Sequence, residues 1–204
     1  MRRGVTTAAL LLGLATGALA AEVRGKVTFN GPLEPEGTVR AQMQNLVFDV
    51  ASAWANCDQQ AMKNAVAETV DFSYPTSRVQ GMDAILADLD AFCKNASDTS
   101  IYFPADAFFI DETAGRIAAE VQFRTFQRGN RQVVNDVRVA HIKDGRITVI
   151  KEYLDGRVKD LQALGVLELE EDPEMLTPWP PRTAEWKDCF PIVKAAPTNS
   201  CPAK

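Results

Sequence analysis

The stretch QVVNDVRVAHIKDGRITVIKEYLD, from Gln132 to Asp155, decides the fold of this chain. Two segments with alternating apolar residues flank the dipeptide Asp144-Gly145, which is the strongest short-range signal for a β-hairpin. Because the side chains of a strand alternate between the two faces of a sheet, the pairing register decides which polar groups are buried. The register of this hairpin therefore determines where any buried chemistry lies.

A further strand is predicted at 116–127, joined to the hairpin by a turn at 128–131. This turn gives the face-to-face pairs Val121–Val137, Ala119–Val139, Phe123–Asn135 and Ile117–His141 on an apolar face, which should be buried. On the opposite face it pairs Gln122 with Asp136. It also pairs Glu120 with Arg138 as a surface ion pair of low energy.

The turn at Asp144-Gly145 then brings Glu152 to the same inward face as Asn135 and His141. A buried carboxylate is costly unless it is hydrogen-bonded, ion-paired or kept neutral by a raised pKa. This cost favours a lined cavity over a solid core. In the alternative interpretation, Glu152 leans out at the end of the sheet and caps the first helix.

The rest of the domain is predicted from its hydrophobic periodicity. Apolar residues at helical spacing indicate helices over 38–55, 58–66 and 82–96, with Asp58 as the N-cap of the second. Strands are expected at 70–74, 99–110 (interrupted at Pro104), 116–127, 132–143 and 146–153. Helices followed by an antiparallel meander are typical of an α+β domain with its helices on one face of the sheet.

The N-terminal segment 1–20 has the pattern of a secretory signal peptide. A basic start at Arg2-Arg3 precedes a short apolar stretch and the sequence Ala18-Leu19-Ala20 before Ala21. The stretch is shorter than the about 20 residues of a comfortable membrane span, although an uncleaved anchor is the alternative. We therefore expect a periplasmic or secreted protein with no membrane span after cleavage.

Cleavage changes the formal net charge from -5 to -7, because Arg2 and Arg3 are lost. An acidic surface without a Lys/Arg cluster argues against nucleic acid or anionic membrane as a partner. After the signal peptide, we interpret 21–37 as a leader with an edge strand at 25–30, and 38–157 as the folded domain. Residues 158–204 then form a helix and a Pro-rich tail that carries Trp179 and Trp186.

The four cysteines predict two disulfides in an exported protein, with three possible connectivities. Proximity in the sequence favours Cys189–Cys201 in the tail, which leaves Cys57–Cys93 for the domain. A metal site is disfavoured because the chain has no C-x-x-C motif and one histidine. No cofactor is expected.

The candidate site consists of the residues predicted on the inward face. The candidate catalytic residues are Glu152 and Tyr74, and the candidate ligand-binding residues are Trp54, Phe123, Asn135, Val137, His141 and Ile150. Structural roles are the alternatives. His141 would then be a surface-near structural histidine, Asn135 would bond a neighbouring loop, and Tyr74 would be a packed ring.

The segment 54–155 resembles the SnoaL-like branch of the nuclear transport factor 2-like superfamily. The resemblance lies in the segments AWANCDQQAM, VDFSYP, VQGMDAILADLDAF, IAAEVQFRTFQRGN and KDGRITVIKEYLD. It implies a cone-shaped barrel in which three N-terminal helices pack on a strongly curved, mostly antiparallel sheet around an apolar pocket. It also implies frequent homodimers through the outer sheet face.

The catalytic sets that the resemblance implies are incomplete in this chain. The aspartate base of ketosteroid isomerases corresponds to Tyr74, and their tyrosine falls near Val50. In limonene epoxide hydrolases an Asp-Arg-Asp set activates water. The last of these acids corresponds to Glu152, but the other two positions fall near Ala119 and Val121. The polyketide cyclases use a pocket acid, which Glu152 can supply.

Three functions therefore stay open. The first is binding of a small hydrophobic molecule in an apolar pocket. The second is a lyase or isomerase (cyclase) type of enzyme, in which Glu152 removes a proton next to a carbonyl and Tyr74 or His141 stabilises the enolate. The third is a structural or protein-interaction domain with a filled core. The missing acid–base partners favour the first over the second.

Overall fold

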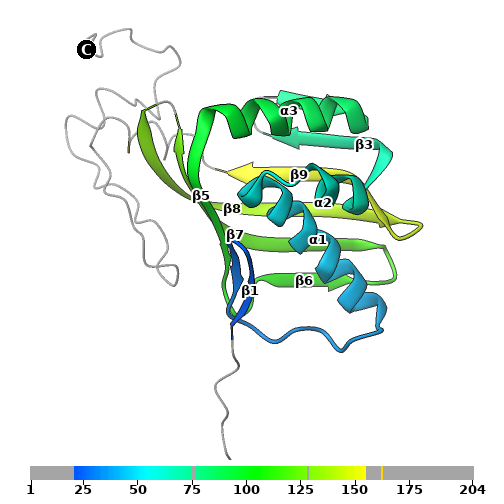
Figure 1. The fold of residues 1–204 in the computed structure, drawn as a ribbon. Helices are drawn as coiled ribbons and strands as arrows, with labels where there is room; N and C mark the ends of the chain where they lie inside the picture. The colour runs from blue at the N-terminus through cyan, green and yellow to red at the C-terminus, as the bar shows by residue number, and fades with distance from the viewer. Residues whose placement is uncertain (1–20, 75–76, 128, 155–161, 163–204) are drawn as a thin grey trace, which may run out of the picture.

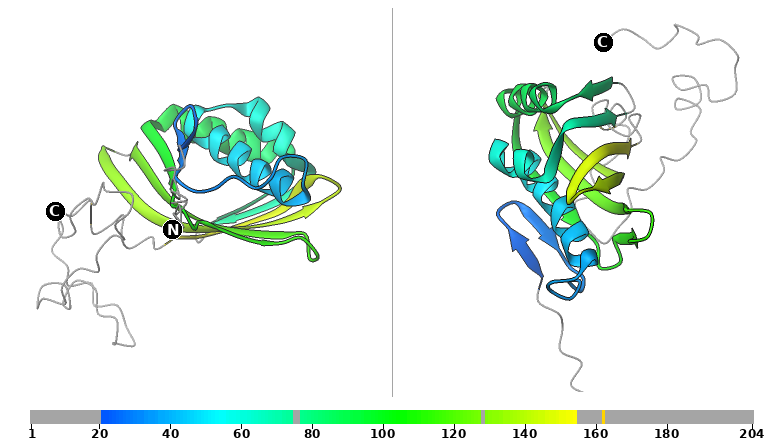
Figure 2. Two further views of the ribbon diagram at one scale, coloured as in Figure 1. Left: turned by 90° about the horizontal axis from the view of Figure 1, so that it is seen from below. Right: turned by 90° about the vertical axis from the view of Figure 1, so that its right-hand side faces the viewer.

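The computed structural model describes residues 21–74, 77–127, 129–154 and 162. Three helices lie on one side of a curved sheet (Figure 1), and the sheet bends around them (Figure 2). The predicted α+β class is therefore confirmed. None of the helices in these described ranges is long and apolar enough to cross a membrane.

Two of the three helices begin after a polar N-cap residue, and the third begins after a glycine. Helix α1 (Val39–Asn56) starts after Thr38, whose side chain accepts a hydrogen bond from the Ala41 backbone N–H. Helix α2 (Gln59–Ala65) is capped by Asp58, as predicted. Helix α3 (Met82–Asn95) follows Gly81, which has a φ of 86°.

The strands form one mixed, mostly antiparallel sheet. Within the described residues its order is β1-β2-β5-β7-β8-β9-β3-β4, and β6 pairs separately with β7. Parallel pairing occurs between β2 and β5 and between β3 and β9. The bounds are β1 Glu22–Arg24, β2 Val27–Phe29, β3 Val66–Tyr74, β4 Ser77–Gln80, β5 Ala96–Phe103, β6 Phe108–Asp111, β7 Arg116–Gln127, β8 Asn130–Lys143 and β9 Arg146–Leu154.

The stretch interpreted as a leader contributes to the core. Strand β2 lies within the predicted edge strand and extends the sheet beside β5. Its Phe29 is buried, and the Phe29 ring centroid lies 5.5 Å from that of Phe48 and 5.3 Å from that of Phe108. Burial of aromatic rings is a large favourable contribution, so this hairpin stabilises the end of the sheet near α1.

The predicted register between β7 and β8 is wrong by one residue. Gln127 pairs with Asn130, so the connection is two residues shorter than the predicted turn at 128–131. Ala119 consequently faces Arg138, and Val121 faces Asp136. A shift of one residue moves every side chain of a strand to the other face, and β8 is therefore inverted relative to the prediction.

The hairpin between β8 and β9 starts as predicted. Asp144 and Gly145 have φ values of 52° and 72°, and Lys143 pairs with Arg146. The register then shifts between His141 and Ile142, and after this irregularity Arg138 faces Glu152. This shift of one residue cancels the one-residue error in the predicted pairing of β7 with β8. Glu152 therefore lies on the inner face of the sheet, as predicted.

Three candidate residues of β8 consequently lie on the outer face, away from the helices. Asn135 faces Gln122, Val137 faces Glu120 and His141 faces Arg116. Val139, also predicted to face inward, shares this face and pairs with Ala118. The predicted inward position of Asn135, Val137 and His141 is corrected. The predicted surface ion pair between Glu120 and Arg138 is also wrong, because Arg138 is buried on the inner face.

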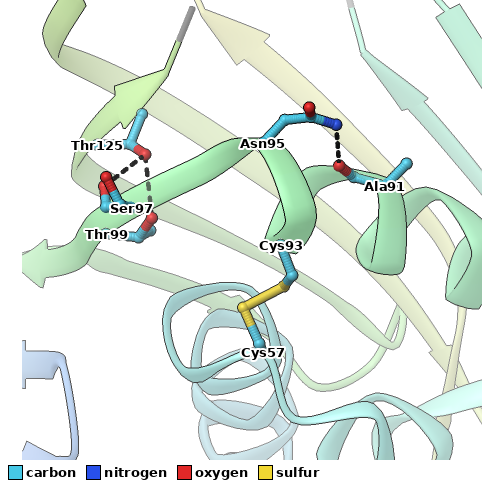
Figure 3. Close-up of a disulfide and its surroundings, with 7 residues drawn as sticks. All are labelled: Cys57, Ala91, Cys93, Asn95, Ser97, Thr99 and Thr125. Carbon is cyan, nitrogen blue, oxygen red and sulfur yellow. Dashed lines mark hydrogen bonds between the residues drawn. A yellow bond between two sulfur atoms is a disulfide. The ribbon is translucent and has the colours of Figure 1, made fainter. Parts of the chain in front are cut away.

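The predicted disulfide between Cys57 and Cys93 is present and joins the end of α1 to α3 (Figure 3). Their Cα atoms are 5.9 Å apart, and 36 positions separate them in the sequence. The proposed Cys189–Cys201 pair, the signal peptide and the tail with Trp179 and Trp186 lie outside the described residues.

We expect the Cys57→Ala/Cys93→Ala variant to lose about 3–4 kcal/mol of unfolding free energy, because the bridge restricts a loop of this size in the unfolded chain. Urea unfolding should be compared in a Cys189→Ser/Cys201→Ser background, where dithiothreitol should destabilise only the chain that keeps Cys57 and Cys93. Equal midpoints for the two chains under oxidising conditions would contradict this assignment.

Candidate functional site

A buried ion cluster lies on the inner face where β8 and β9 pair. The Arg138 Nε donates to Asp136 Oδ2 and to Glu152 Oε1, both at 3.1 Å, and Arg138 Nη2 lies 3.0 Å from Glu152 Oε1. The side chains of Arg138, Asp136 and Glu152 are 8%, 1% and 11% exposed. One guanidinium is therefore shared by two carboxyl groups out of bulk water.

Burial sets the protonation of this cluster. It raises the pKa of Asp136 to about 8, against the opposing effect of Arg138 and with the added repulsion of Glu152. Burial disfavours the charge of Arg138, but attraction to Glu152 and Asp136 outweighs this effect and raises its pKa. At pH 7 the cluster thus contains a guanidinium cation and an Asp136 that retains its proton.

Two atoms of the cluster have unused hydrogen-bonding capacity. Among the described residues, the buried atoms without a partner include Asp136 Oδ1 and Arg138 Nη1. Native structures leave few buried polar atoms unpaired, since each costs about 1–3 kcal/mol. Arg138 therefore retains an unused donor and Asp136 an unused carboxyl oxygen.

A second polar pair extends this network toward α3. The Tyr74 hydroxyl donates to Asp88 Oδ2. Burial raises the pKa of Asp88, and the negative charge of Glu152 raises it further. Tyr74 stands at the end of β3, and its ring centroid is 4.4 Å from that of Phe72. Tyr74 is thus connected through Asp88 to the electrostatic field of the ion cluster.

Aromatic residues surround the polar network. The Arg138 guanidinium carbon lies 6.0 Å from the centroid of Phe123, whose ring is 6.0 Å from that of Phe92. The ring centroid of Phe92 in turn lies 5.3 Å from that of Trp54. Ile150 is buried beside Phe72 on β3. The structure therefore brings Trp54, Phe123, Ile150, Glu152 and Tyr74 to the helix-facing side of the sheet; their ligand-binding and catalytic roles stay predictions.

The outer-face candidates lie in a different environment. Burial lowers the pKa of His141, and the positive charges of Arg116 and Lys151 lower it further. His141 is therefore held neutral among cations on the opposite side of the sheet from Glu152. Asn135 and Val137 share that outer face, so none of the three contributes to the ion cluster.

Sequence reasoning missed Asp136, Arg138 and Asp88. The alternation Asp-Val-Arg-Val at 136–139 is equally compatible with either face, and the usual preference for buried valines selected the wrong one. A usable signal was the pairing of Glu152 with Arg138 on the neighbouring strand, with Asp136 two residues before Arg138 on the same face, which becomes visible once β8 is shifted by a residue. The contact of Asp88 with Tyr74 could not be predicted from the sequence, because it depends on how α3 packs on β3.

The chain belongs to the SnoaL-like domain family, whose model matches residues 47–150, just over half of the chain. The fold is that of the nuclear transport factor 2-like proteins. Among curated proteins, none matches this chain.

Solved structures share this fold at low sequence identity. An LEH-like epoxide hydrolase of M. tuberculosis is 17% identical over 61% of this chain and 90% of its own, with a TM-score of 0.53. A putative polyketide cyclase of Bacillus cereus is 16% identical over 70% and 92%, with a TM-score of 0.52. A Catenulispora acidiphila protein with a ketosteroid isomerase-like fold, in complex with trimethylamine, is 12% identical over 57% and 90%, with a TM-score of 0.52.

In the part of the chain that the structure describes, no group of histidine, cysteine and acidic residues is arranged to hold a metal ion.

We expect the unfolding free energy to fall as the pH rises from about 4 to about 8, because the folded state retains a proton on Asp136 that the unfolded chain, with an ordinary pKa of 3.8, releases. The contribution is complete below the ordinary pKa and is lost as the pH rises through the folded one. Asp136→Asn should flatten the profile by up to about 1.4 kcal/mol per pH unit. Urea unfolding between pH 5 and 8 measures the slope. Asp71→Asn, an exposed ion-pair control, should keep the wild-type slope, and parallel curves for Asp136→Asn would refute the assignment.

Arg138→Met should destabilise the fold by about 3–5 kcal/mol, because it leaves buried acids without their cation. The triple variant Asp136→Leu/Arg138→Met/Glu152→Leu should recover most of this loss, since it removes the unpaired charges together. Chemical unfolding at pH 7 tests both expectations. Arg78→Met, which breaks an exposed pair with Asp71, should cost less than about 1 kcal/mol. Wild-type stability in Arg138→Met would contradict the prediction.

Proposed function

We propose that this protein is an acid–base enzyme of the lyase or isomerase type that acts on a small, uncharged, largely apolar molecule. The observation that carries the proposal is the buried bridge from Arg138 to Asp136 and Glu152. In the sequence, Glu152 lacked acid–base partners at the expected positions, which favoured a binding protein. Asp136 and Arg138 now supply such partners. A carboxyl group that keeps its proton beside a second carboxyl group is a usual basis of acid–base chemistry.

In the proposed reaction, a carbonyl oxygen accepts hydrogen bonds from Arg138 Nη1 and from protonated Asp136. Glu152 removes a proton from the adjacent carbon, and the electron pair of that C–H bond forms an enolate, whose oxygen the two donors stabilise. Glu152 then returns the proton to a different carbon, which completes an isomerisation. A positioned acid or base of this kind contributes roughly 10²- to 10⁴-fold to the rate.

The electrostatics of the site favour an uncharged substrate. Arg138 is already shared by two carboxyl groups, and Asp88 adds a third acid within the influence of Glu152. A carboxylate substrate would face this excess of acidic groups. The surrounding rings of Trp54 and Phe123 support an apolar body for the molecule.

A second candidate reaction is the addition of water to an epoxide. Arg138 and Asp136 stand directly opposite Ala119 and Val121, the positions at which the resemblance to limonene epoxide hydrolases implies an acid and an arginine. An acid–arginine–acid set thus exists one strand away at the same level of the sheet. Glu152 would take a proton from water as the water oxygen forms a bond to a ring carbon, the C–O bond of that carbon to the epoxide oxygen breaks, and Asp136 gives its proton to the epoxide oxygen.

We further propose that the enzyme acts in the periplasm or outside the cell and forms a dimer through its outer sheet face. The signal-peptide pattern of 1–20 and the disulfide between Cys57 and Cys93 support an oxidising compartment. The exposed Tyr153 and the half-buried Val137 on the outer face support a dimer contact.

Two small substrates test the proposal. 3-Cyclohexenone should isomerise to its conjugated form, or styrene oxide should be hydrated to the diol. With the substrate that reacts, Glu152→Gln and Asp136→Asn should each lower kcat by roughly 10²-fold or more while KM stays within a few-fold. Asp71→Asn serves as the matched acid-to-amide control and should retain wild-type activity.

The two variants also separate an enzyme from a binding protein. Turnover that survives in Glu152→Gln and Asp136→Asn would exclude their acid–base role. Binding of either compound with no turnover in the wild-type protein would leave ligand binding as the function. Neither binding nor turnover would favour the structural domain.

A further inference from the structure

The inner face of the sheet carries a second group of polar side chains, nearer to the start of β8 than the ion cluster. Along β8, the side chains that face the helices are, in order, Gln132, Val134, Asp136 and Arg138. On β7 the facing residues are Thr125, Phe123, Val121 and Ala119. The polar ion cluster is therefore separated from a distal polar group by an apolar middle made of Val134 and Phe123.

The distal group consists of Thr99, Thr125 and Gln132, which are 6%, 0% and 8% exposed. Gln132 faces Thr125 across the β7–β8 pair. The hydroxyl oxygens of Thr99 and Thr125 are 3.0 Å apart, and Thr125 Oγ1 donates to the Ser97 carbonyl oxygen at 3.4 Å (Figure 3). The hydroxyl proton of Thr125 is thereby used, so Thr99 donates to Thr125.

The distal group still has one free hydrogen-bond acceptor. The Gln132 Oε1 atom is buried and has no hydrogen-bond partner among the described residues. With the threonine protons already placed, this oxygen requires an external donor. A buried amide oxygen without a donor is rare in a packed core. The ion cluster has the opposite requirement, because its Arg138 Nη1 lacks an acceptor.

The two polar groups on this part of the inner face therefore differ in their hydrogen-bonding requirement. The ion cluster has a free donor at Arg138, and the distal group has a free acceptor at Gln132. Four residues of strand separate Asp136 from Gln132, which corresponds to about 13 Å of backbone before the side chains reach inward. Phe123 pairs with both Val134 and Ile101, and the ring of Phe92 on α3 lies 6.0 Å from that of Phe123. This middle suits a flat apolar body.

We propose that Thr99, Thr125 and Gln132 form a second binding subsite that accepts a hydrogen bond from a hydroxyl group at the far end of an elongated, uncharged ligand. The oxygen at the near end of the ligand binds Arg138, which rests on the proposed function. The substrate class is thus a hydroxy-ketone or hydroxy-epoxide with an apolar body between its two polar ends.

Three naphthalenes of matched shape test this subsite. 2-Acetylnaphthalene carries the near oxygen alone, 6-hydroxy-2-acetylnaphthalene adds a donor at the far end, and 6-methoxy-2-acetylnaphthalene has a far oxygen without a donor. Their binding can be followed by ligand fluorescence. We expect the hydroxy compound to bind about two- to tenfold more tightly than the methoxy compound, the value of one hydrogen bond.

This preference should disappear in Gln132→Leu and persist in Gln122→Leu. Gln122 is an equally buried glutamine on the outer face that also has a partnerless side-chain atom. The comparison of the hydroxy and methoxy compounds on the wild-type protein needs no variant, so a misfolded Gln132→Leu does not block the test. Equal affinities for these two compounds, or an unchanged preference in a folded Gln132→Leu, would overturn the proposal.

Arg138→Met distinguishes the subsite from the function on which it rests. Because this substitution also destabilises the fold, its folded state is first verified by circular dichroism, and weaker binding of all three compounds by the folded variant supports the near anchor. If Arg138→Met has no effect while the hydroxyl preference depends on Gln132, the distal subsite stands and the proposed role of Arg138 is wrong. If none of the compounds binds the wild-type protein, the distal subsite is overturned, whereas turnover of 3-cyclohexenone or styrene oxide decides the proposed function.

Discussion

The sharing of Arg138 between Asp136 and Glu152 is the constraint on which the inner face of this sheet depends. Removing three ionisable groups from water is unfavourable, and their mutual attraction offsets this cost only if both acids reach the same guanidinium. That requirement fixes β8 and β9 in a single register. Burial, together with the repulsion of Glu152, outweighs the attraction of Arg138, which explains why Asp136 keeps a proton.

The irregularity between His141 and Ile142 is what makes this register possible. A regular continuation from the Asp144-Gly145 turn would place Glu152 opposite Val137 rather than Arg138. The Thr148 hydroxyl donates to the His141 carbonyl oxygen at 3.2 Å beside this shift, which satisfies a backbone group that the irregular ladder would otherwise leave weakly bonded. Bulges near functional sites commonly re-aim side chains in this way, and here the side chain is Glu152.

The sequence is sufficient for the elements whose determinants are local. Asp58 caps its helix, Asp144-Gly145 makes its turn, and Cys57–Cys93 is the bridge that proximity in the sequence favoured among three possible connectivities. The face of β8 could not be predicted, because it depends on the length of the preceding connection and on an alternation of valine with charge that fits either side. Preference for burying Val137 and Val139 failed where Asp136 and Arg138 serve a buried network, and such conflicts between local pattern and fold are expected at functional sites.

The helical layer holds the polar network in place. The Cys57–Cys93 bridge ties α3 to the end of α1, and α3 carries both Asp88, which bonds Tyr74, and Phe92, which packs between Trp54 and Phe123. A cluster of buried charges keeps its geometry only if the surrounding apolar contacts are rigid, because a small displacement would expose one acid and leave the other unpaired. The acid–base chemistry proposed for Glu152 would therefore require the aromatic packing beneath α3 as much as it requires Arg138, and the most sensitive positions outside the cluster should be those that fix α3 against the sheet.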